Sequence, residues 1–67
     1  MMAVGVHMTD TDALRVFLLD LLTTMPTDFL ATEEGRADVV MSYERMADAA
    51  HPAVADVLRE AARRVKG

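Results

Sequence analysis

The chain has 67 residues, 52% of them hydrophobic, with no cysteine and a formal net charge of −4 at pH 7. A chain this short buries on folding only roughly 60% of the surface that its unfolded form exposes, so its core needs additional support. The lack of cysteine excludes disulfides and the commonest zinc ligand. Oligomerisation or docking onto a larger protein remains as the source of that support. The negative charge argues against sequence-independent binding to nucleic acid, whose affinity depends on neutralising phosphates.

Residues 1–8 contain no predicted element. The segment lacks the basic region that opens a signal peptide, and Met8 is a second start-like methionine. The longest apolar stretch, residues 16–22, is interrupted by Asp20 and is far shorter than the ~20 residues of a membrane span. We therefore expect a flexible leader over 1–8, a single helical domain over 9–67, no membrane contact and a cytoplasmic location. The alanine, arginine, valine and aspartate bias suggests a high-GC bacterial or phage genome.

The first helix is predicted over residues 11–25. Thr9, Asp10 and Thr11 offer capping side chains, and Pro26 ends the helix. A main apolar stripe follows helical spacing and consists of Leu14, Phe17, Leu18, Leu21, Leu22 and Met25. We expect this stripe to form the shared core of an assembly.

Two further apolar residues, Val16 and Leu19, lie off the main stripe of this helix. A helix that is apolar nearly all round is normally buried on more than one side. So small a chain has too little other protein to cover both sides. We therefore expect Val16 and Leu19 to supply an additional interface with a second copy or another chain.

Two more helices are predicted over residues 32–50 and 52–66, after a short turn at 26–32. Thr32 can cap the first of them, with Gly35 near its start, and His51-Pro52 marks the boundary between the two. Their apolar faces consist of Val39, Val40, Tyr43, Met46, Ala47 and Ala50, and of Val54, Val57, Leu58, Ala61, Ala62 and Val65. The sequence predicts an all-α fold, a small antiparallel three-helix bundle completed by oligomerisation or by docking onto a partner.

The one combination of residues with metal-ligand character is Glu44, Asp48 and His51, at spacings i, i+4 and i+7. Pro52 is expected to end the helix at His51, and the chain has no second set of this kind to complete a shell. Ser42, the single serine, has no evident partners for a nucleophilic triad. We therefore predict no catalytic, cofactor-binding or metal-binding residue, no cofactor and no enzymatic activity. A domain this small also leaves little room for a substrate pocket of ~300 Å³.

Charge is unevenly distributed along the chain. Residues 1–50 hold nine acidic and three basic residues, whereas residues 51–67 hold two acidic and four basic ones. The basic residues of the last helix are Arg59, Arg63, Arg64 and Lys66. They are candidates for electrostatic contact with an acidic patch of a partner. They also allow an alternative, a small DNA-binding transcriptional regulator, although recognition helices usually contact bases through their N-terminal part.

The sequence thus favours a non-enzymatic helical protein–protein interaction module over the DNA-binding alternative. Such a module either self-associates, for example as a homodimer, or serves as an accessory, adaptor or docking subunit of a larger protein. Met25, Met41 and Met46 lie near the apolar faces, and methionine adapts well to irregular partner surfaces. The expected partner is a protein, with a homo-oligomer favoured; nucleic acid is disfavoured.

Overall fold

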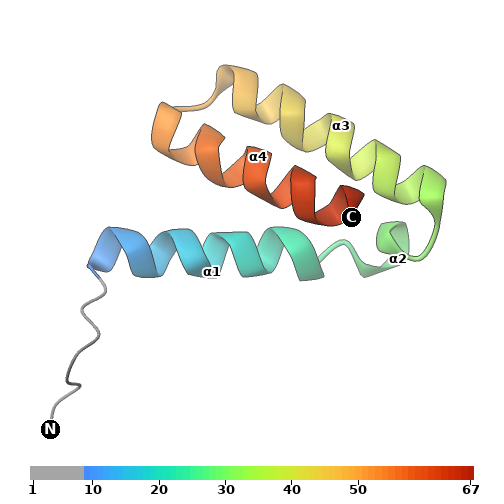
Figure 1. Cartoon of the computed structure of the whole chain (residues 1–67), viewed down its shortest axis with the longest axis horizontal. Helices are drawn as coiled ribbons and strands as arrows, with labels where there is room; N and C mark the ends of the chain where they lie inside the picture. Colours follow the sequence, from blue (N-terminus) through green and yellow to red (C-terminus); the bar gives the residue numbers. More distant parts are fainter. Residues whose placement is uncertain (1–8) are drawn as a thin grey trace, which may run out of the picture.

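The computed structural model describes residues 9–67, and helices are the only regular structure in that part of the chain. They are α1 (Asp10–Thr24), α2 (Thr27–Leu30), α3 (Glu33–Ala49) and α4 (Pro52–Lys66), shown in Figure 1. The all-α class is confirmed. The leader expected over residues 1–8 lies outside the described residues.

The helix starts follow from capping side chains in the sequence. Thr9 and Thr32 each accept a 3.0 Å hydrogen bond from the backbone N–H three residues later, at the starts of α1 and α3. His51 Nδ1 accepts a 3.1 Å bond from the backbone N–H two residues later, and Pro52 is the first residue of α4. Each cap satisfies a backbone donor that the first helical turn leaves without a partner.

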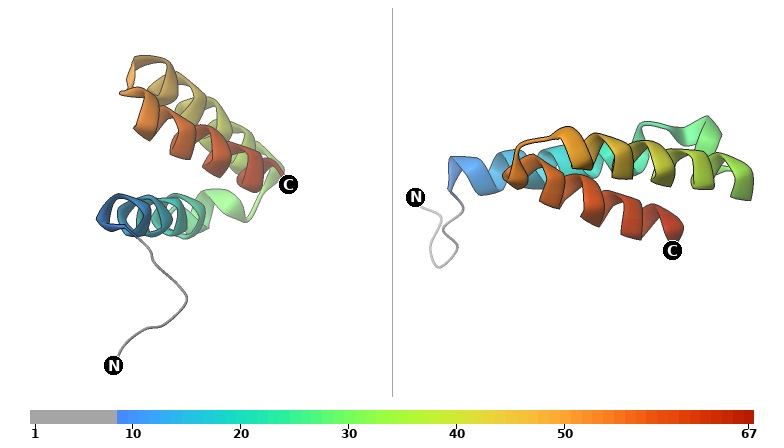
Figure 2. Two further views of the ribbon diagram at one scale, coloured as in Figure 1. Left: turned by 60° about the vertical axis from the view of Figure 1, so that its left-hand side comes forward. Right: turned by 90° about the horizontal axis from the view of Figure 1, so that it is seen from above.

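α4 is the central helix of the fold. α3 and α4 form an antiparallel hairpin, and α1 packs on α4 from the other side, running in the same direction as α4 (Figures 1 and 2). α2 packs against α3 near the start of that helix. α4 lies between α3 and α1 and holds most of the buried residues in the described part of the chain, namely Ala55, Val57, Leu58, Ala61, Ala62 and Val65.

The core is built largely from small side chains. Ala47 of α3 packs with Ala55 and Leu58 of α4, and Leu22 of α1 lies against this cluster. Alanines let two helix backbones approach closely, but they bury little apolar area per residue. Two residues expected on the core faces, Met46 and Val54, are instead 53% and 41% exposed. Met46 is exposed on α3, against which α1 makes little contact because it packs mainly on α4.

Gly35 is required where α2 meets the first turn of α3. A Cβ atom at this position would lie 2.0 Å from the backbone oxygen of Phe29 and 2.7 Å from its carbonyl carbon. The Arg36 guanidinium also reaches α2, donating a 2.9 Å hydrogen bond to the Leu30 carbonyl. Gly35 weakens the helix by its low propensity, but it allows the backbone of α2 to lie against α3, which a larger residue would prevent.

We expect the substitution Gly35→Ala to lower the free energy of unfolding by about 1–3 kcal/mol, as is usual for overpacking. The loss outweighs the gain of about 1 kcal/mol in helix propensity, because the obstructing atoms are backbone atoms and α2 must move away. Urea denaturation followed by circular dichroism measures the change. Glu34→Ala, at the exposed neighbouring position, is the control and should have little effect. A Gly35→Ala variant that is more stable than the wild type would contradict this packing of α2.

Candidate docking surface

One side of α1 is held against α4 by a long-range ion pair. Arg15 Nη2 lies 2.7 Å from Asp56 Oδ2, and the two residues are 41 positions apart in the sequence. Val16 and Leu19, expected to face a partner, instead line a hollow of about 230 Å³ together with residues of α4 that include Val57. Leu19 is partly buried there, while Val16 at the rim is largely exposed.

The second half of α1 is fixed by a contact with α3. The Tyr43 hydroxyl donates a 2.7 Å hydrogen bond to the Leu22 carbonyl oxygen, and the Leu22 side chain packs on the core cluster. Burial raises the pKa of the Tyr43 phenol. This bond and the Arg15–Asp56 pair both join α1 to the α3–α4 hairpin. The structure therefore turns α1 differently from the sequence-based expectation, with Arg15, Leu19 and Leu22 inward.

Another side of α1 presents large apolar side chains to solvent. Leu14 is 67% exposed, Phe17 61% and Met25, at the C-cap, 70%. Leu21 lies between them in the same row and is partly buried. We call these four residues, at spacings i, i+3, i+7 and i+11, the outer stripe of α1. Of the predicted interface residues, Leu18 is the remaining one and is partly buried at the edge of this row.

The exposed residues that border the outer stripe are acidic or uncharged. Asp10 precedes Leu14 by four positions and Asp20 follows Phe17 by three, so both carboxylates are helix-surface neighbours of the stripe. Arg15, the single basic residue of α1, is paired on the α4 side. The stripe is thus an apolar row with negative charge along its border.

The basic residues of α4 are mostly paired within the chain. Arg59 lies 3.3 Å from Asp48, and Arg64 lies 2.9 Å from Glu60, which also binds Arg63. Hydrogen bonds from Arg63 and Arg64 lower the pKa of the Glu60 carboxyl, and the same contact raises the pKa of Arg63. These arginines, predicted to contact a partner, therefore already have carboxylate neighbours on α3 and α4.

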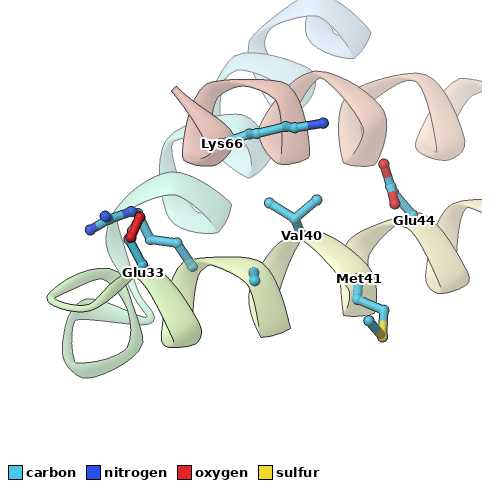
Figure 3. A pocket seen from close by; sticks show the side chains of 7 residues that line it. Glu33, Val40, Met41, Glu44 and Lys66 are labelled. Atoms are coloured by element: carbon cyan, nitrogen blue, oxygen red, sulfur yellow. The ribbon is translucent and has the colours of Figure 1, made fainter.

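Lys66, the last predicted contact residue, borders an open groove between α3 and α4. Figure 3 shows its side chain above Val40, with Glu44 and Met41 further along α3. The groove has a volume of about 410 Å³, larger than the sequence led us to expect, and a second hollow of about 540 Å³ shares Val40, Glu44 and Lys66 with it. Most of the lining side chains are exposed, so these hollows are surface grooves.

Glu44, Asp48 and His51 serve three separate roles. Asp48 pairs with Arg59, His51 caps α4 through Nδ1, and Glu44 borders the groove near Lys66. Within residues 9–67, no group of three or more potential ligands is arranged to hold a metal ion.

Sequence reasoning missed the residues that orient and border the surface. Tyr43 was placed in the apolar face of its helix, but its hydroxyl bond to α1 has no signature in helical spacing. Asp10 was read as a capping residue and Asp20 as an interruption of the apolar run. Their i+4 and i+3 spacing to Leu14 and Phe17 was the available signal that they border the stripe.

Comparison with protein-family models, with curated proteins and with solved structures gives no match for this chain. None of the helices in residues 9–67 has both the length and the apolar character that crossing a bilayer requires.

We expect Tyr43→Phe to lower the free energy of unfolding by about 0.5–1.5 kcal/mol, because the Leu22 carbonyl loses its side-chain donor. The raised pKa of Tyr43 also predicts an alkaline effect. Its contribution to stability is complete below the unfolded pKa, near 10, and is lost as pH rises through the higher folded value.

Tyr43 itself provides a spectroscopic probe for its own ionisation. Tyr43 is the only tyrosine and the chain has no tryptophan, so tyrosinate absorbance reports on this phenol alone. Denaturant unfolding at neutral and at alkaline pH gives the free energy of unfolding at each pH. The Tyr43→Phe variant is the control. Its free energy of unfolding should fall less at alkaline pH than that of the wild type, because it has no phenol to ionise. Titration of Tyr43 at or below the pKa of the unfolded chain would refute the assignment.

Proposed function

We propose that this protein is a non-enzymatic helical protein–protein interaction module that docks through the outer stripe of α1. One observation carries the proposal: α1 and its C-cap hold eight large apolar side chains, yet α1 has no buried residue. Exposed apolar rows of this kind usually mark an interaction site on a small protein.

The energetics support an external partner for this row. Complete burial of a leucine, phenylalanine or methionine side chain contributes about 1.5–3 kcal/mol. Leu14, Phe17 and Met25 each keep more than half of that area in water. A domain of this size has a thin margin of stability, so covering these residues would strengthen the fold as well as hold the partner.

Docking would also complete the architecture. In the proposed arrangement α1, α3 and α4 act as an antiparallel three-helix bundle, and a helix from outside lies on the free side of α1. That helix belongs either to a second copy, which gives a homodimer, or to a larger protein for which this chain is an accessory or adaptor subunit. Neither arrangement requires a cofactor or a catalytic residue.

The pairing of the α4 arginines supports a protein partner over DNA. Binding phosphates would require Arg59, Arg63 and Arg64 to leave Asp48 and Glu60, whose carboxylates would then face the DNA backbone. The acidic border of α1 adds further repulsion. We therefore place the docking function on α1 and assign the α4 pairs to the surface of the fold.

We expect the double substitution Leu14→Gln/Phe17→Gln to leave the free energy of unfolding within about 0.5 kcal/mol of the wild type, because both side chains are exposed. The matched control Leu22→Gln changes the same residue type on the inward side of the same helix. It should cost about 2 kcal/mol or more, because an amide would replace a leucine that packs on the core cluster.

Circular dichroism gives helicity and stability for each variant, and light scattering over a range of concentrations gives the solution mass. Any self-association of the wild type should disappear in the double variant. Unfolding of the Leu14/Phe17 variant to the same extent as the Leu22 variant would place the stripe in the chain's own core and overturn the proposal.

A further inference from the structure

Resting on the proposed docking function, we infer that the occupant of the outer stripe is a basic amphipathic helix of another protein. Its recognition face would carry an apolar row matching Leu14, Phe17, Leu21 and Met25, with lysine or arginine residues on its borders. The inference names the class of partner and depends on the shape of the stripe and on the charges beside it.

The shape of the stripe fits a helix. The row from Leu14 to Met25 spans eleven helical steps, roughly 16 Å, with its side chains three and four residues apart. Rows with these spacings form the ridges that pack into the grooves of a second helix lying nearly parallel to the first. A peptide that bound by strand addition would need a free sheet edge for its backbone hydrogen bonds, and residues 9–67 contain no strand.

The charges beside the stripe select a basic partner. Asp10 and Asp20 are exposed at its border, and Asp28 is exposed just beyond Met25. Arg15 is held by Asp56 on the inward side and is not available to balance them. Charged residues that flank an apolar seam determine which helices pair, as in coiled coils, so lysine or arginine on the incoming helix would complement this border.

A second copy of the chain is a poorer fit for the same reasons. The centre of the stripe lies between Phe17 and Leu21, so antiparallel pairing of two stripes about a two-fold axis brings Asp20 of each copy toward the other across the seam. Like charges that face each other across a helix pair disfavour that pairing. The basic helix α4 of a second copy is not a substitute, because its arginines are already paired with Asp48 and Glu60.

The test uses the full chain and two synthetic helical peptides of equal length that share one leucine row. The first peptide has lysine at the border positions and the second has glutamate. Isothermal titration calorimetry at two salt concentrations measures binding. We expect the lysine peptide to bind about tenfold more tightly than the glutamate peptide, with the difference shrinking as salt increases.

Two double variants locate the selecting charges. Asp10→Lys/Asp20→Lys should reverse the preference in favour of the glutamate peptide. Glu34→Lys/Asp38→Lys makes the same change in charge at a first-turn and a mid-helix position of α3, both exposed, and should keep the preference for the lysine peptide. Leu14→Gln/Phe17→Gln should abolish binding of both peptides.

Three outcomes would overturn the inference, and they differ in what they leave of the proposed function. Equal binding of both peptides, lost in the Leu14/Phe17 variant, rejects the basic partner but keeps the docking surface. Self-association of the wild type through the stripe, with neither peptide bound, makes a second copy the occupant. Binding of the lysine peptide that survives the Leu14/Phe17 substitutions is general charge attraction, and it rejects both the inference and the stripe as the docking site.

Discussion

The most extensive contact between helices in the described residues is that of α3 with α4, and small side chains lie at its centre. Ala47, Ala55, Ala61 and Ala62 are almost completely buried, and Leu58 is the largest side chain in the cluster that holds this hairpin together. Small side chains bring the two backbones together but leave little apolar volume for a third helix to share. α1 packs on α4 beside Arg15 and Leu19, while its larger side chains Leu14, Phe17 and Met25 remain exposed.

The parts of this fold that the sequence predicts are those determined within a few residues. Thr9, Thr32 and the His51-Pro52 pair act on the backbone two or three positions away, and helical spacing marks the apolar stripe of α4. The rotation of α1 is a different kind of property. Its apolar residues surround most of the helix, so periodicity does not distinguish the side that faces α4 from the side that faces solvent.

Two contacts between distant residues form with α1 in that rotation. Arg15 binds Asp56, and the Tyr43 hydroxyl binds the Leu22 carbonyl, across 41 and 21 positions of sequence. Neither pair can be found before the helices are placed in space. Helical spacing thus points to the helix with surplus apolar surface, whereas the side of it that faces α4 is visible only in the structure. Gly35 is a similar case. A glycine is needed there because the backbone of Phe29 lies against it, and Phe29 belongs to α2, which the sequence indicated only as a short turn.

The distribution of ion pairs determines the charge beside the exposed stripe. Along α4 each arginine has a carboxylate within the chain, so that surface is locally balanced. Along the outer side of α1 the carboxylates of Asp10 and Asp20 have no basic neighbour on their own helix, because Arg15 is turned inward. Carboxylates without a basic neighbour destabilise the fold little while they face water, because exposed charges are well solvated. They become important when a second surface covers the stripe and removes that water, because repulsion or attraction across the seam is then felt at a shorter range and in a lower dielectric. The same arrangement that leaves α1 apolar thus also places carboxylates beside it, so a covering surface of negative charge would be repelled and one of positive charge attracted.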